Sequence, residues 1–223
     1  MTEAAIEFES GPDPRASLIV LHGLGADGND FVPVCEALRL DAVGPVRFVL
    51  PHAPIRPVTL NGGHRMRAWY DILALQGPRR EDEAGLRQSM LLIQGLIARE
   101  QQRGVRPERI VLAGFSQGCA MTLMTGLRHT ERLAGLACLS GYLPLAGLTA
   151  AEASPANRAT PIFMAHGQHD GMIALPRAQE SRDALVQLGY AVQWHDYPME
   201  HSVCLEEIAD LNRWLLQVWA APA

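Results

Sequence analysis

Short apolar runs alternate with helix-like segments along the whole chain. The runs are rich in Val, Ile, Leu and Ala, and several are continuous rather than alternating, which is typical of strands buried on both faces of a sheet. The strands that this pattern predicts cover residues 17–22, 47–50, 109–113, 133–139, 161–165 and 191–197.

Helical periodicity separates the runs. Between residues 81 and 103, Leu86, Met90, Ile93 and Ile97 recur at steps of four, three and four, which predicts an amphipathic helix. Residues 176–188 and 208–218 show the same helical spacing of apolar residues. The alternation of strands and helices predicts an α/β fold with a mostly parallel central sheet and helices on both faces.

The chain shows no internal repeat, low-complexity linker or break in composition. Its 223 residues therefore predict a single α/β domain over residues 1–223. Two long irregular stretches, residues 51–63 and 143–160, interrupt the pattern. Long loops in a compact α/β domain are often lids or pocket walls, so we expect these two to shape a site.

Composition and charge narrow the function. The net charge is −5, and all 19 basic residues are arginine. The absence of lysine excludes Walker-type phosphate loops and Schiff-base chemistry. Because the sequence contains no basic stripe, we expect no nucleic-acid partner.

Compartment and membrane signals are weak. Residues 133–151 carry no charge, but glycines and a proline interrupt them, so a buried strand and an apolar loop are expected rather than a membrane span. The acidic start MTEAAIEFES has no apolar signal region, and the four cysteines form no CxxC pair. We therefore expect free thiols and a cytoplasmic protein.

The strongest chemical signal is Gly114-Phe115-Ser116-Gln117-Gly118, which follows the apolar run RIVLA and precedes a helix-compatible stretch. Strand, G-x-S-x-G, helix is the context of a nucleophile elbow. The glycines admit a tight, strained turn, and the helix N-terminus beneath it favours a developing anion. Ser116 is therefore the candidate nucleophile.

A serine nucleophile needs a base. His201 follows the last predicted strand, in YPMEH, and fits the chain order nucleophile, acid, base. His195 is the rival, but it lies inside the strand pattern QWHDY, where it should point at a sheet face.

The acid must orient the base. Asp170, in HGQHD, comes directly after the predicted strand PIFMA, at the sheet edge where sites of this class lie. Asp196 and Asp183 are poorer candidates, one within a strand and one on a polar helix face. The pair His166 and His169 lacks a third clustered ligand, so we expect no metal.

Two backbone amides should hold the oxyanion. One is that of Gln117, the residue after the nucleophile, and the other comes from the loop after an early strand. The sequence His22-Gly23-Leu24-Gly25 follows SLIVL at that place, which indicates the amide of Leu24.

With these residues in view, the chain resembles the carboxylesterase/acyl-protein thioesterase family of small α/β-hydrolases from about Ser17 to Trp219. The landmarks, in order, are LHGLGADGNDF, FVLPHAPIRPVTLNGG, the stretch MRAWYDI, GFSQGCAM, HGQHDGMI and YPMEHSVC. The resemblance implies an α/β-hydrolase fold, hydrolysis of carboxylic esters, thioesters or lysophospholipids, no cofactor, and a frequent homodimer. It assigns the triad to Ser116, Asp170 and His201, and the oxyanion hole to Leu24 and Gln117.

The sequence departs from the family pattern beside the base, where Glu200 stands in place of a common glycine. A carboxylate turned inward there would raise the pKa of the imidazole. The residues after Asp170 read GMIALP, where a proline or aliphatic run is more usual, so the pocket edge is expected to differ.

Several alternatives stay open. Trp69 and Leu73, with Tyr70 and Leu75, are expected to wall the acyl pocket, unless Trp69 and Leu73 are core residues. The main expectation is an esterase for short to medium acyl or aryl esters, with long acyl thioesters or lysophospholipids as the alternative. A lactone or dienelactone hydrolase is a further alternative, although the cysteine, Cys119, lies beyond the elbow. A silent α/β-hydrolase scaffold that binds a ligand is the alternative outside enzymes.

Overall fold

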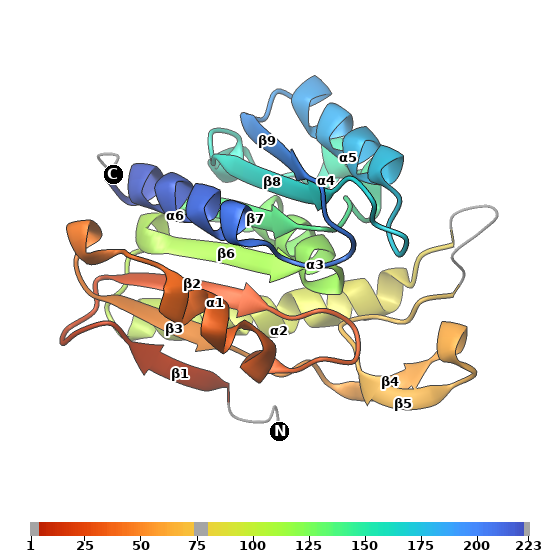
Figure 1. Ribbon diagram of the computed structural model, residues 1–223, viewed down its shortest axis with the longest axis horizontal. Helices are drawn as coiled ribbons and strands as arrows, with labels where there is room; N and C mark the ends of the chain where they lie inside the picture. The colour runs from red at the N-terminus through yellow and green to blue at the C-terminus, as the bar shows by residue number, and fades with distance from the viewer. Residues whose placement is uncertain (1–4, 74–79, 221–223) are drawn as a thin grey trace.

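The computed structural model describes residues 5–73 and 80–220. Its centre is a seven-stranded sheet in the order β1-β3-β2-β6-β7-β8-β9 (Figure 1). Every neighbouring pair is parallel except β1 and β3. The strands are β1 (Ile6–Glu9), β2 (Ala16–Leu21), β3 (Val46–Leu50), β6 (Ile110–Phe115), β7 (Gly135–Leu139), β8 (Ile162–Gly167) and β9 (Val192–Tyr197). The predicted mostly parallel sheet is confirmed.

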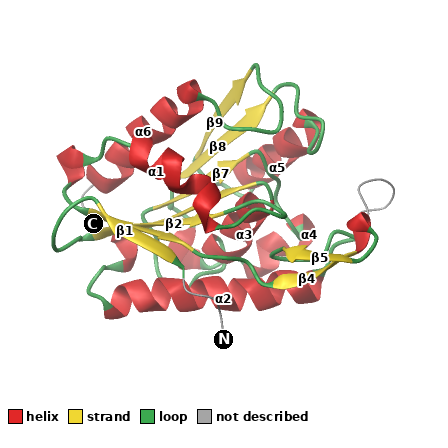
Figure 2. Ribbon diagram, turned by 60° about the horizontal axis from the view of Figure 1, so that its bottom comes forward, coloured by secondary structure: helices red, strands yellow, loops and turns green. Residues whose placement is uncertain are grey.

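Helices cover both faces of the sheet, as Figure 2 shows. The α-helices are α1 (Val32–Ala37), α2 (Glu83–Gln102), α3 (Gln117–Gly126), α4 (Ala146–Glu152), α5 (Leu175–Gln187) and α6 (Leu205–Ala220). Short 3₁₀ turns are η1 (Gly28–Phe31), η2 (Asp41–Val43), η3 (Thr59–Asn61), η4 (Pro107–Arg109) and η5 (Pro155–Asn157).

Two apolar clusters fill the space between the layers. Residues of α1 and α6 share one cluster with Leu18 and Val20 of β2, while residues of α2, α3 and α5 share the other with Ile19 and Leu21. Successive side chains of a strand point to opposite faces, so a strand between two helical layers is buried, and mostly apolar, at successive positions. This explains the continuous apolar runs.

The structure corrects three expectations. Strand β1 was not predicted, because two half-buried residues alternate with two exposed ones in this short strand at the sheet edge. The segment 51–63 is not wholly irregular: Ile55–Val58 forms β4, which pairs with β5 (His64–Arg67) in a two-stranded hairpin. This strand was not predicted because it contains Pro57, and proline is tolerated in a strand mainly at edges.

The third correction concerns the loop predicted at residues 143–160, which contains helix α4 and turn η5. The charge-free residues 133–151 form strand β7, a connection and most of α4. Among the described residues, none of the helices has both the length and the apolar character needed to cross a bilayer.

The carboxyl ends of β2 and β6 point toward the side of the molecule where the β4–β5 hairpin lies (Figure 1). Loops that follow parallel strands meet at this edge. The residues predicted for the triad and the oxyanion hole lie in these loops or, for Gln117, at the start of α3.

Candidate active site

Ser116 occupies the sharp turn between β6 and α3. Its backbone has φ 56° and ψ −115°, a conformation that non-glycine residues rarely adopt and that stores strain at functional turns. Its amide donates to the carbonyl oxygen of Leu139 on β7 at 2.9 Å. The neighbouring strand thus holds the turn in place.

The glycines of the elbow are required by close backbone approach. A Cβ at Gly114 would lie 2.2 Å from the carbonyl oxygen of Gly118, and a Cβ at Gly118 would lie 1.9 Å from that of Leu21. Both distances are far below contact. The spacing of the motif therefore allows α3 to start directly against β2 and β6.

Gln117 begins α3, where the first amides have no acceptor within the helix and the helix dipole is positive. Its side chain is buried: Oε1 accepts the amide of Trp69 at 3.0 Å, and Nε2 donates to the carbonyl of Tyr70 at 2.9 Å. These two bonds fasten the segment before α2 to the elbow.

The loop after β2 passes beside Ser116. A Cβ at Gly23 would lie 3.4 Å from Cβ of Ser116, and Leu24 lines the same cavity as Ser116. His22 anchors the loop because its Nε2 accepts the amide of Ala53 at 2.9 Å and its Nδ1 contacts the carbonyl of Gly23 at 2.7 Å. Burial lowers the pKa of His22, which keeps the ring neutral with the proton on Nδ1.

Asp170 and His201 meet at the ends of β8 and β9. Nδ1 of His201 lies 2.6 Å from Oδ2 of Asp170, and Oδ1 accepts the amides of Met172 and Ile173 at 2.8 Å each. The Asp170 side chain is fully buried. The His201 ring lies 4.7 Å from the ring of Phe115, the residue before Ser116.

Close approach of the two strand ends depends on Gly167. A Cβ there would lie 2.3 Å from the carbonyl oxygen of Glu200. Glu200 itself is exposed, so its backbone rather than its carboxylate faces the strand end.

His166 belongs to this cluster, a placement that the sequence analysis missed. Its Nε2 lies 2.8 Å from the carbonyl of Ile173 and 3.4 Å from Oδ2 of Asp170. Burial lowers its pKa, so the neutral ring donates from Nε2 and holds the Asp170–Ile173 turn. His169 is exposed; in the described part of the chain, no three side chains of the metal-binding kinds come together.

Ser116, His201, Leu24 and Gln117 line one cavity of about 520 Å³. Its size lies within the range of small-molecule sites. Polar and apolar groups share its walls, and the Asp170 carboxylate lies behind His201, out of the lining.

Of the residues expected to wall an acyl pocket, some line the cavity and one does not. Leu73 and Tyr70 line the cavity, whereas Trp69 does not. Trp69 is 1% exposed, and its indole Nε1 donates to the carbonyl of His22 at 2.9 Å, so it supports the loop from within the core. Leu75 lies outside the described residues.

The rejected candidates lie elsewhere. His195 stacks on Tyr197, with Nδ1 3.4 Å from a carboxylate oxygen of Asp210. Asp196 is exposed on β9, and Asp183 is exposed on α5. None of these lines the cavity.

Cys119 is fully buried, where a Cβ at Gly141 would meet its Sγ at 2.4 Å. It does not line the cavity. A cysteine nucleophile of the dienelactone hydrolase kind is therefore not supported.

Comparison with known proteins agrees with the architecture. A family model described as phospholipase/carboxylesterase matches residues 1–219. Acyl-protein thioesterase 1 of Neurospora crassa is 42% identical over 212 residues, covering 91% of this chain and 86% of that protein. The corresponding protein of Yarrowia lipolytica is 39% identical over 216 residues, covering 95% of each chain.

Solved structures give the same result. The crystal structure of Arabidopsis thaliana SOBER1 is 28% identical, with a TM-score of 0.86 over 92% of this chain and 99% of that one. That of Zea mays acyl-protein thioesterase 2 is 27% identical, with a TM-score of 0.83 over 96% and 99%. The family resemblance of the sequence is thereby confirmed: the chain belongs to the phospholipase/carboxylesterase family of α/β-hydrolases.

Proposed function

We propose that this hydrolase of carboxylic esters works through an acyl-enzyme formed on Ser116, with His201 as general base and acid and Asp170 as the group that orients it. The observation that carries the proposal is the 2.6 Å contact between a buried Asp170 and His201, which lines the cavity that also contains the strained Ser116 turn.

Nδ1 of His201 donates to Asp170, which leaves Nε2 unprotonated and able to accept a proton. His201 then takes the hydroxyl proton as Ser116 attacks the ester carbonyl, and the tetrahedral oxyanion forms. The amides of Gln117 and Leu24 are the proposed donors to this oxygen; the loss of one such donor typically costs about 2.7–4 kcal/mol of transition-state stabilisation.

Collapse of the intermediate transfers the proton from His201 to the leaving alcohol. Water enters, His201 takes one of its protons, and the resulting hydroxide attacks the acyl-enzyme carbonyl. His201 then returns that proton to the Ser116 oxygen as the bond to the acyl group breaks and the acid leaves. No step uses a cofactor or metal ion.

The test is Ser116→Ala, assayed on p-nitrophenyl butyrate. We expect kcat to fall by about 10⁴-fold or more, with an unchanged urea unfolding midpoint as the control for folding. A fluorophosphonate probe should label the wild type at Ser116 and leave the variant unlabelled. Activity close to wild type in the folded variant would refute the assignment, and a wild type that is neither active nor labelled would favour a silent scaffold.

The second candidate substrate is a long-chain acyl thioester. It is favoured by the relatives in Neurospora crassa and Yarrowia lipolytica, both named acyl-protein thioesterase 1. A series of p-nitrophenyl esters from acetate to palmitate, run beside a palmitoyl thioester, separates the two. A maximum of kcat/KM at two to eight carbons supports the short-chain esterase, and a maximum at sixteen supports the thioesterase.

We also propose a single-domain enzyme that acts in the cytoplasm as a homodimer. The free thiols of all four cysteines suit a reducing compartment. Light scattering coupled to size-exclusion chromatography tests the dimer, and a mass near 24.3 kDa would show a monomer instead.

A further inference from the structure

A guanidinium group lies in the wall of the catalytic cavity. Arg177 is in the first turn of α5 and lines the same cavity as Ser116. Its guanidinium carbon lies 3.5 Å above the ring centroid of Tyr142, which is close enough for a cation–π contact. A cavity that served only alkyl chains would gain nothing from a cation at this place.

The platform beneath Arg177 is fixed. The hydroxyl groups of Tyr142 and Tyr70 are 2.8 Å apart, and burial raises the pKa of both phenols, so both are neutral. The carbonyl of Tyr70 is in turn held by Nε2 of Gln117, at the start of α3. Arg177 is thus stacked on a wall that is tied to the nucleophile elbow.

Among the described residues, no carboxylate lies within ion-pair distance of Arg177. The two half-buried carboxylates of the cavity have other donors. Oε2 of Glu81 accepts the amide of Leu145 at 3.1 Å, and the carboxylate of Asp71 accepts the amide and hydroxyl of Thr59 at 2.7 and 2.6 Å. A guanidinium has five donors, and the buried Nε of Arg177 has no partner in the described structure.

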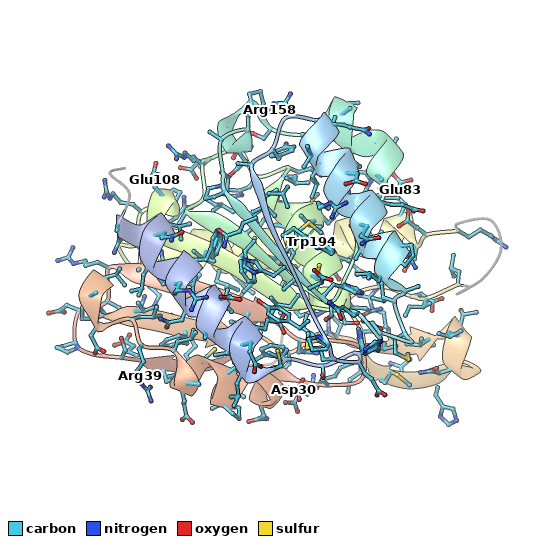
Figure 3. All side chains as sticks on the ribbon, turned by 45° about the horizontal axis from the view of Figure 1, so that its top comes forward. Asp30, Arg39, Glu83, Glu108, Arg158 and Trp194 are labelled. Atoms are coloured by element: carbon cyan, nitrogen blue, oxygen red, sulfur yellow. The ribbon has the colours of Figure 1, made fainter. Side chains whose placement is uncertain are left out.

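The other charged groups that line the cavity, Asp30 (labelled in Figure 3) and Arg80, are exposed. Solvent screens exposed charges strongly. Within the described part of the chain, Arg177 is therefore a half-buried cation of the cavity that is stacked on Tyr142 and forms no ion pair with a protein carboxylate.

We propose that Arg177 forms a subsite for a carboxylate at the far end of the substrate, so that the enzyme prefers esters that carry a second, anionic carboxyl group over neutral esters of the same length. The inference rests on the proposed serine-hydrolase function and adds the substrate class to it. A guanidinium suits this role because its planar fork binds a carboxylate through two parallel hydrogen bonds.

The experiment compares pairs of esters of equal length that differ in the terminal group. The acyl-side arm uses the p-nitrophenyl hemiesters of glutarate and adipate beside p-nitrophenyl pentanoate and hexanoate. The alcohol-side arm uses O-butyryl glycolate beside ethyl butyrate, followed by proton release. The measured quantity is the ratio of kcat/KM for the anionic ester to that for its neutral partner.

Arg177→Met should lower this ratio by about tenfold, since a hydrogen bond to a charged group contributes more than a neutral one. Arg177→Lys should retain part of it. The matched control is Arg182→Met on the same helix: Arg182 lies 5.0 Å over the ring of Trp194 on β9 (labelled in Figure 3) but outside the cavity, so the ratio should not change.

Binding is measured separately in the Ser116→Ala background, where the hemiester is not consumed. The dissociation constant for the adipate hemiester should rise about tenfold when Arg177→Met is added, and that for the hexanoate ester should not. A ratio and a dissociation constant that do not respond to Arg177→Met overturn the subsite, whether or not Ser116 is the nucleophile. Loss of the ratio in one arm identifies the side of the ester that carries the anion.

Discussion

The contact between Asp170 and His201 gives the sharpest test of the proposed mechanism. Asp170→Asn retains the size of the side chain and leaves an amide oxygen that can accept the two backbone amides now bound by Oδ1. The change falls on the 2.6 Å contact with Nδ1 of His201. An amide NH₂ there favours the wrong imidazole tautomer and removes the negative charge that stabilises the imidazolium.

The expected loss is large because the Asp170 side chain is fully buried, where no solvent replaces the missing charge. We expect kcat on p-nitrophenyl butyrate to fall about 10³–10⁴-fold, which corresponds to about 4–5.5 kcal/mol of transition-state stabilisation. KM should change little, because Asp170 does not line the cavity. The free energy of unfolding in urea should fall by no more than about 1–2 kcal/mol.

Two further variants separate the loss of the Asp170 charge from the loss of its backbone contacts and from a general effect of removing a carboxylate. Asp196→Asn is the matched control, because Asp196 is exposed on β9 and accepts from the side chain of Gln168 at 3.0 Å; its kcat should equal that of the wild type. Asp170→Ala also removes the acceptor of the amides of Met172 and Ile173, both of which line the cavity, so KM should rise as well. A folded Asp170→Asn enzyme that kept more than a tenth of the wild-type kcat would refute the role of Asp170.

Two stability predictions follow from close packing and from a buried acid. Gly118→Ala should lower the free energy of unfolding in urea by about 3 kcal/mol or more, because its Cβ would lie 1.9 Å from the backbone oxygen of Leu21. Gly95→Ala, in the middle of α2 with no atom near its Cβ, should stabilise by about 0.5–1 kcal/mol; equal effects at the two glycines would contradict the packing argument. Burial raises the pKa of Glu207 from its ordinary value of 4.5 to about 8. Between these pH values the unfolded chain ionises Glu207 while the folded protein keeps it protonated, so the wild type should lose up to about 5 kcal/mol of stability from pH 4.5 to pH 8. Glu207→Gln should lack this loss in urea titrations at several pH values, and identical pH profiles would show that the buried acid is not its source.

The central strands of the sheet could be predicted because strands that are buried on both faces appear in the sequence as continuous apolar runs. Every residue of β2, β3 and β8 is buried, and each of these strands overlaps a predicted apolar run. The edge strand β1 and the hairpin strand β4 leave a weaker trace, since half-exposed strands of four residues carry too few apolar positions to stand out.

Some residues of the candidate site could likewise be predicted from the sequence, and others could not. Ser116 and the glycines around it form one continuous segment, so local backbone requirements determined their order and spacing. The chain order of Ser116, Asp170 and His201 was also readable, because each follows a strand and parallel strands end at one edge of the sheet.

Only the tertiary structure decided which aromatic and basic side chains reach the cavity. Trp69 and Tyr70 are neighbours in the sequence, yet the indole is sealed in the core and the phenol lines the site. No sequence pattern predicted that Arg177 would line the cavity, because a helical arginine is ordinarily a surface residue. Its position depends on where α5 packs relative to the loop after β7. Such placements are set by contacts between segments far apart in the chain, and those contacts leave no periodic or motif signal in either segment alone.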